Sequence, residues 1–236
     1  KRSRQSYLRA MHQFQNYCCK PLEAITEDDL RKYWLCCKDD LKWSPATIRI
    51  SYSGIKHFFT YTIKRDWPIF SQFKLETSQS LPVVLSVDEV RTILAAFPEG
   101  QNRTFFETVY SLGLRLTEAR TLQVRDIDSD RMLVHVHAGK GAKDRLVPLP
   151  QTTLEALRRY WKTHRNPKWL FPGLGRDGRG GRTAEKPASE GAVQGALRRV
   201  CQKLGIKKHV RTHTFRHYAT HLIEAGYDIR TVQGLL

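Results

Sequence analysis

Three stripes of apolar residues at helical spacing run through residues 1–75. Thr26 and Ser44–Pro45 give start signals for the second and third stripes, because a Ser or Thr side chain caps a first turn and Pro fits its first position. Each stripe predicts a helix with one face in a shared core, so a small helical bundle is expected here. The stripes are Tyr7, Leu8, Met11, Phe14 and Tyr17; Leu30, Tyr33, Trp34 and Cys37; and Ile48, Tyr52, Ile55, Phe58 and Phe59.

Residues 76–85 interrupt this periodicity. They combine Ser, Thr and Pro, a composition that is typical of a linker. Directly afterwards, Ser86 and Glu89 stand three residues apart, which is the signature of a capping box at a helix start. The chain is therefore predicted to contain a helical domain over 1–75, a linker over 76–85 and a second domain over 86–236.

The second domain mixes helical and strand patterns. Two short runs rich in Val and Leu are joined by a segment containing Gly and Lys, and they predict an antiparallel hairpin. Thr117 is a candidate cap for a helix from Glu118 to about Val124. The predicted fold is mainly α with a small antiparallel β-sheet, in which a helical domain precedes an α+β domain. The predicted strands are Met132–His137 and Arg145–Leu149, and the other predicted helices of this domain before residue 205 span 87–97, 101–112, 151–164 and 189–204.

Residues 212–223 are predicted to form a helix with one apolar and one polar face. Thr212 is its candidate N-cap, and Gly226 is placed to end it. On the polar face, His213 and Arg216 project together beside a helix N-terminus, whose free N–H groups favour an anion. This arrangement predicts a phosphate site, although an isolated His-x-x-Arg pair is more often a solvated surface, so the interpretation depends on partners elsewhere. The apolar face consists of Phe215, Tyr218, Ala219 and Leu222.

Basic residues greatly outnumber acidic ones. The chain has 236 residues with 40 Lys and Arg against 23 Asp and Glu, a formal net charge of +17. From Arg158 to Arg211 there are 15 basic and 3 acidic residues, and a bias this concentrated indicates a nucleic acid partner. The Gly- and Arg-rich loop over 173–181 lacks the Gly-Lys-Ser/Thr ending of a nucleotide-binding loop, so it is interpreted as a basic loop that contacts DNA backbone.

The five cysteines form two vicinal pairs, Cys18–Cys19 and Cys36–Cys37, and a lone Cys201. Their odd number and the absence of Cys-x-x-Cys spacing favour a reduced, cytoplasmic protein with buried helical thiols over a disulfide framework or a zinc site. No long apolar run or signal peptide is present, so no membrane partner is expected. Asp126 and Asp128 are interpreted as shaping a turn rather than as a metal pair. The start at Lys1 without a methionine predicts a fragment or a processed form.

Three motifs belong together by their order and spacing. Gly-Leu-Arg-Leu-Thr-Glu spans 113–118, Gly-Lys-Gly-x-Lys-Asp-Arg spans 139–145, and His-x-x-Arg-His begins at His213. With these motifs the chain resembles the tyrosine recombinases, particularly the branch of Xer proteins, phage integrases and integron integrases. The resemblance is close over 86–236, while the first 75 residues match the core-binding domain of the family only in character.

The resemblance implies attack of a tyrosine on a DNA phosphodiester, with a 3′-phosphotyrosyl intermediate and neither metal nor cofactor. Arg115 and Arg216 correspond to the two family arginines that neutralise the phosphorane. Lys140 corresponds to the general acid for the 5′-oxygen, with Lys143 as the competing assignment, and His213 would bond the phosphate or handle the proton of the nucleophile. The supporting acid is Glu118, which without an arginine partner would be only a charge in a first helical turn.

The implied partner is double-stranded DNA, on which family members assemble as a dimer per site and a tetramer in synapsis. The implied location is the prokaryotic cytoplasm, on the nucleoid. The residues expected to bind DNA are Arg49, Lys56, Lys143, Arg145, Arg176, Arg179 and Arg182.

The nucleophilic tyrosine is expected beyond Leu236. Tyr218 and Tyr227 are the nearest tyrosines, and neither matches the family position. The 236 residues are therefore expected to bind DNA without cleaving it. One alternative is a DNA-binding regulator without catalysis on the same scaffold, although binding alone does not need the whole set Arg115, Lys140, His213 and Arg216. The other is a type IB topoisomerase, which relaxes DNA without site preference.

Overall fold

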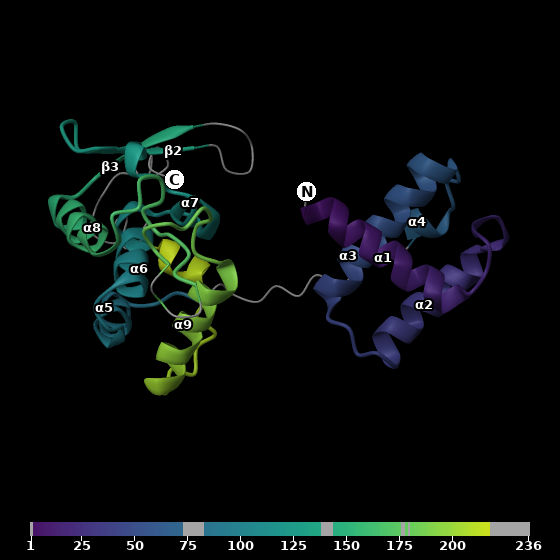
Figure 1. Ribbon diagram of the computed structural model, residues 1–236. Coiled ribbons are helices and arrows are strands. Elements are labelled where there is room, and N and C mark those ends of the chain that lie inside the picture. The colour runs from purple at the N-terminus through teal and green to yellow at the C-terminus, as the bar shows by residue number, and fades with distance from the viewer. Residues whose placement is uncertain (1, 73–82, 138–143, 176–177, 179, 218–236) are drawn as a thin grey trace. The chain divides into compact units, whose positions relative to one another are not determined.

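The computed structural model describes residues 2–72, 83–137, 144–175, 178 and 180–217, with backbone only for Arg2, Arg216 and His217. It divides into two compact units, Lys1–Leu81 and Pro82–Leu236 (Figure 1). Most of the predicted linker over 76–85 lies outside the described residues, and 83–85 form neither helix nor strand.

The first unit is entirely helical in its described part. Thr26 and Asp29 form a capping box at the start of the second long helix, and the Ser44 side chain accepts the Thr47 N–H at the start of the third, as the sequence predicts. A π-helical turn, Phe59–Ile63, continues the third helix and ends at Lys64 in the left-handed conformation. The α-helices are α1 (Arg2–Cys18), α2 (Glu27–Asp39), α3 (Pro45–Phe58) and α4 (Ile69–Gln72), with a 3-10 turn at Leu22–Ala24.

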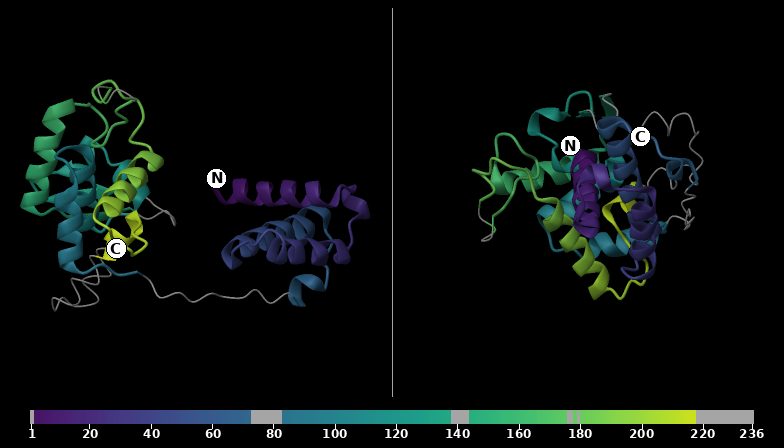
Figure 2. Two further views of the ribbon diagram at one scale, coloured as in Figure 1. Left: turned by 90° about the horizontal axis from the view of Figure 1, so that it is seen from below. Right: turned by 90° about the vertical axis from the view of Figure 1, so that its right-hand side faces the viewer.

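Helices α1 and α3 lie alongside each other in this unit (Figure 2). Their approach is close at Gly54, where an added Cβ would stand 3.0 Å from the Cα of Tyr7. The stripe on α2 is wholly buried, as predicted. The stripe on α1 is only partly right, because Leu8 and Tyr17 are 51% and 44% exposed while Ala10 takes a core position beside Met11 and Phe14. The buried face of α1 is the face in contact with α3, and it covers fewer residues than the apolar stripe predicted from the sequence.

The second unit combines helices with a three-stranded antiparallel sheet. The strands follow the order β1-β2-β3, and Val134 of β2 is paired with Val147 of β3, so the predicted hairpin is confirmed. Both valines are buried on the core side of the sheet. The elements are α5 (Val87–Ala96), α6 (Gln101–Leu112), α7 (Leu116–Arg120), η3 (Val124–Asp126), β1 (Ile127–Asp128), β2 (Leu133–Val136), β3 (Arg145–Pro148), α8 (Gln151–His164), α9 (Glu190–Lys203) and η4 (Thr212–His217).

Two local predictions in this unit are wrong. Helix α7 begins at Leu116 and ends at Arg120, rather than running from Glu118 to Val124 under a Thr117 cap. The cause is that the Glu118 carboxylate reaches back to accept the N–H of Arg115, which starts the helix two residues earlier. Ile127 and Asp128 also form a short strand against β2, where only a turn was expected.

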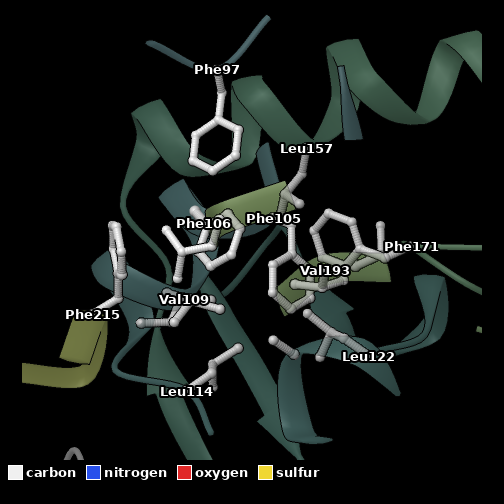
Figure 3. Packing of buried hydrophobic residues seen from close by; sticks show 14 of the residues in the cluster. Phe97, Phe105, Phe106, Val109, Leu114, Leu122, Leu157, Phe171, Val193 and Phe215 are labelled. Carbon is white, nitrogen blue, oxygen red and sulfur yellow. The ribbon is translucent and has the colours of Figure 1, made fainter. Parts of the chain in front are cut away.

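The core of this unit gathers aromatic rings from distant segments (Figure 3). Phe106 of α6 stacks on Phe97 and also contacts Phe215 of η4, whose ring centroid lies 5.2 Å away. Phe215 is completely buried, as predicted from its apolar face. The last described segment is therefore fixed to α6 by its aromatic side chain.

The described cysteines are all free thiols, but they are not uniformly buried. Cys37 and Cys201 are buried, whereas Cys19 is exposed because it lies just past the end of α1 in a left-handed conformation. Among the described helices, none is long and apolar enough to cross a membrane.

Candidate active site

Arg115 stands at the junction of two helices. Gly113 ends α6 with φ of 60°, a left-handed conformation that glycine adopts without strain, and its N–H donates to the Val109 carbonyl. Leu114 then turns into the core, where it is 1% exposed. With its neighbour anchored in this way, Arg115 emerges at the start of α7 with its side chain 42% exposed. The anchored backbone at Gly113 and Leu114 therefore places the Arg115 guanidinium at the surface in a defined position.

Glu118 holds this guanidinium in place. Its Oε1 accepts Nη1 of Arg115 at 2.7 Å, and its Oε2 accepts the Arg115 backbone N–H at 2.8 Å. The same two oxygens accept Nη1 and Nη2 of Arg145 at 3.0 and 2.9 Å. The Glu118 side chain is 3% exposed, so its charge is neutralised inside the protein by two arginines.

These contacts set the protonation state of Glu118. Burial by itself raises the pKa of the carboxyl, but the bonds from Arg145 and from the backbone and side chain of Arg115 outweigh burial and lower the pKa to about 2. Glu118 is therefore ionised at neutral pH and acts as an anchor for Arg115. The predicted arginine partner of Glu118 is present, and a second, Arg145, was not expected from the sequence.

Arg145 was predicted to bind DNA. The structure directs both of its terminal nitrogens to Glu118 and leaves its side chain 16% exposed, so its cation is already paired within the protein. Its remaining Nε is buried with no hydrogen-bond partner among the described groups. The geometry therefore gives Arg145 a positioning role behind Arg115, and a contact of Arg145 with DNA stays a prediction.

His213 lies on η4. The described part of the predicted helix, 212–217, is a 3-10 helix rather than an α-helix, and Thr212 is its first residue instead of its N-cap. The capping contact is made by Thr214, whose Oγ1 accepts the Arg211 N–H at 3.0 Å. Phe215 points into the core, while His213 is exposed, so the predicted division into an apolar and a polar face holds as far as residue 215.

Several predicted site residues fall outside the described part of the chain. These include the two candidate general acids, both tyrosines near the end and the side chain of Arg216. Among the described DNA-binding candidates, Arg49 and Arg182 are exposed, and Nζ of Lys56 lies 3.4 Å from the Phe70 carbonyl oxygen. The residues not described are Lys140, Lys143, Arg176, Arg179, Tyr218 and Tyr227.

Polar groups also gather where β2 and β3 open toward residues 138–143. His137 Nε2 lies 2.8 Å from Asp126 Oδ1, and Asp126 Oδ2 accepts the Gln123 N–H, so Asp126 shapes a turn as predicted and also holds a histidine. The Asp126 hydrogen bond raises the pKa of His137, although partial burial opposes it. No local pattern indicates this pair, because Asp126 and His137 are 11 positions apart and meet only through the tertiary fold.

Comparison with known proteins agrees with this fold. Residues 83–236 match the phage integrase family, and residues 1–69 match the N-terminal SAM-like domain of phage integrases. The chain is 38% identical to y4qK of Sinorhizobium fredii, assigned as an integrase/recombinase, over 98% of the chain and 73% of that protein. It is 37% identical to the tyrosine recombinase XerA of Thermococcus onnurineus over 67% of the chain and 55% of that protein.

Solved structures of recombinases share the architecture. The XerH site-specific recombinase bound to difH substrate aligns with a TM-score of 0.75 at 20% identity, covering 98% of this chain and 71% of that one. The Tn1549 transposon integrase in complex with transposon right end DNA aligns with a TM-score of 0.75 at 18% identity, covering 100% and 85%. The fold is thus that of a tyrosine recombinase. The chain belongs to the phage integrase family, an assignment that rests on the family match over most of its length.

Proposed function

We propose that this protein is a site-specific DNA recombinase that cuts and rejoins DNA through a 3′-phosphotyrosyl intermediate. The observation that carries the proposal is the state of Arg115: its guanidinium is held at 2.7 Å by the buried carboxylate of Glu118 and is still 42% exposed. A cation that only stabilised the fold would gain nothing from this exposure. A cation that must meet a phosphate needs both fixed position and access.

The chemistry follows from the roles of four residues. A tyrosine oxygen attacks phosphorus, the bond to the 5′-oxygen breaks, and negative charge builds on the non-bridging oxygens. Arg115 and Arg216 would stabilise this charge, and loss of one such donor costs roughly 3–4 kcal/mol of barrier. Lys140 would protonate the departing 5′-oxygen, and His213 would bond the phosphate or take up the proton of the nucleophile.

Double-stranded DNA is the proposed substrate. The net charge of +17 and the concentration of basic residues between Arg158 and Arg211 support binding to a polyanion. Two similar structures are of recombinases with DNA, XerH with difH and the Tn1549 integrase with transposon right end DNA. From the family resemblance we also propose that the protein acts on nucleoid DNA in a prokaryotic cytoplasm, as a dimer per site and a tetramer in synapsis.

The 236 residues by themselves are proposed to bind DNA without cutting it. Their two last tyrosines, Tyr218 and Tyr227, do not stand where the family motif requires the nucleophile. Incubation of this chain with radiolabelled DNA should give a retarded complex on a native gel and no covalent adduct on a denaturing gel. A covalent adduct that disappears in the Tyr218→Phe or Tyr227→Phe variant would overturn this assignment.

A substrate with a 5′-bridging sulfur tests the role of Lys140 in a protein that carries the nucleophile. The sulfur leaves without a proton, so Lys140→Ala should be inactive on ordinary DNA and regain cleavage on the sulfur substrate. Lys143→Ala is the matched control and should not show this rescue. If the sulfur substrate restores cleavage by Lys143→Ala and not by Lys140→Ala, then Lys143 is the general acid.

Supercoiled plasmids with and without a candidate site test the reaction class. Recombination should require the site. Relaxation of both plasmids at equal rates by a protein that carries the nucleophilic tyrosine would indicate a type IB topoisomerase. If that protein binds DNA but forms no covalent adduct, it is a regulator.

A further inference from the structure

Three side chains of types that commonly bind metals, His135, His137 and Asp144, converge beside the β2–β3 hairpin. None of them takes part in the hydrogen bonds between Glu118, Arg115 and Arg145. His135 Nε2 lies 2.9 Å from Asp144 Oδ2, and His137 Nδ1 lies 3.5 Å from the same oxygen. One ligand atom from each residue lies within 4.8 Å of the others. Zinc–nitrogen bonds of about 2.0 Å in a tetrahedron put ligands about 3.3 Å apart, so small side-chain rotations would suffice to hold an ion.

The strand register explains this convergence. His135 lies on β2 and His137 directly follows its last residue, Val136. Because side chains alternate along an extended chain, residues two apart point to the same face. Val136 pairs with Arg145, and continuing this register by one residue sets His137 opposite Asp144. Asp144 is then also the diagonal neighbour of His135, within reach of its ring. The arrangement is built from backbone pairing and does not depend on flexible side chains meeting by chance.

A buried carboxylate orients one of the rings. Asp126 has a side chain that is 2% exposed, and its two oxygens accept the Gln123 N–H and face His137 Nε2. An ionised carboxylate can only accept hydrogen bonds, so Nε2 must carry the proton. In the neutral ring this leaves the lone pair of Nδ1 directed toward Asp144. A carboxylate that fixes the tautomer of a ligating histidine is the usual outer contact of a zinc site.

We propose that His135, His137 and Asp144 bind a divalent transition-metal ion, with Zn²⁺ as the expected occupant and Asp126 as the residue that orients His137. Two imidazoles and one carboxylate suit zinc, and the side chains, each between 42% and 48% exposed, leave room for water as a fourth ligand. The ion would replace the proton between His135 and Asp144 and cross-link the two strands. This proposal is independent of the recombinase assignment, since it needs no DNA and no tyrosine.

Titration of the untagged, metal-free 236-residue chain with Zn²⁺ alone, followed by calorimetry, tests the site. The expected result is one equivalent of Zn²⁺ bound through this site, with at least tenfold weaker binding in His135→Asn and in Asp144→Asn. Asp126→Asn should weaken binding by about 10- to 100-fold while leaving all three ligands in place. His12→Asn, which removes an exposed histidine of the first unit, is the control and should bind as the unchanged chain does.

Free thiols are the competing ligands, and Co²⁺ distinguishes them. Co²⁺ in the proposed site should give visible absorption without a thiolate charge-transfer band. Far-ultraviolet circular dichroism checks that each variant is folded. Because His135→Asn and Asp144→Asn both alter side chains that are about half exposed, either variant alone can test the site if the other does not fold. Unchanged Zn²⁺ affinity in both folded variants, or a thiolate band that persists in both, would overturn the proposal.

Discussion

Both oxygens of Glu118 accept a terminal nitrogen of Arg145, at 3.0 and 2.9 Å, across 27 positions of the chain. This two-point contact joins the short helix α7 to the first residue of β3. Because Glu118 also holds Arg115, the position of the exposed guanidinium depends on a strand that is remote in sequence.

Replacing Arg145 by methionine should destabilise the second unit by about 3 kcal/mol, because the buried carboxylate loses its two-point partner. Urea denaturation followed by circular dichroism measures the change in the free energy of unfolding. The control is Arg91→Met, which removes an ion pair with Asp88 in which both side chains are more than three quarters exposed. The control should change stability by less than about 1 kcal/mol. Equal effects of the two substitutions would contradict the structural role of Arg145.

The stability that Glu118 confers should depend on pH in a defined window. Its pKa is lowered from 4.5 to about 2 in the folded chain, so the ionised form is favoured by folding. The contribution is therefore fully present above the unfolded pKa of 4.5 and is lost as the pH falls toward 2, a change of roughly 3 kcal/mol. The difference in free energy of unfolding between the unchanged chain and Glu118→Gln, measured by urea denaturation from pH 6 to pH 2, should shrink across this window. A difference that is constant with pH would show that the carboxylate is not held in its ionised form.

Gly54→Val should destabilise the first unit, because even a Cβ at this position would stand 3.0 Å from the Tyr7 backbone and 3.3 Å from the Ala10 side chain. Overpacking of this kind costs about 1–3 kcal/mol, more than the few tenths that valine gains over glycine in helix propensity. Thermal unfolding followed by circular dichroism measures the effect. Gly191→Ala on α9 is the control, since a Cβ there meets nothing within 4 Å and should be neutral or slightly stabilising. A neutral Gly54→Val would mean that α1 and α3 are not in close contact.

Arg182→Ala should weaken DNA binding and reduce the salt dependence of binding by about one unit of slope in a plot of log K against log salt concentration, as loss of one phosphate contact does. Fluorescence anisotropy with a labelled duplex at several salt concentrations measures both quantities. Arg91→Ala changes the net charge equally but removes an exposed side chain of α5 that pairs with Asp88. If the two variants lose the same amount of slope, Arg182 contributes only net charge and makes no direct phosphate contact.

The helices of the described chain were predictable wherever local signals agree. Ser86 and Glu89 form their capping box, and α8 spans the residues that its apolar period predicts. The hairpin was also predictable, because two β-rich runs close in sequence have few other ways to pair. The start of α7 was not predicted correctly, because its capping contact comes from Glu118 and not from Thr117, the expected cap.

The sequence by itself determined the family motifs, the helical first domain and the two faces of the segment that carries His213 and Phe215, because these depend on residue type and short-range spacing. Only the tertiary structure decided that Arg145 stands behind Arg115 and that Asp126 holds His137. Both relationships depend on tertiary packing, of α7 beside β3 and of η3 beside the end of β2, which brings residues from distant parts of the chain within hydrogen-bond distance and which no local pattern specifies.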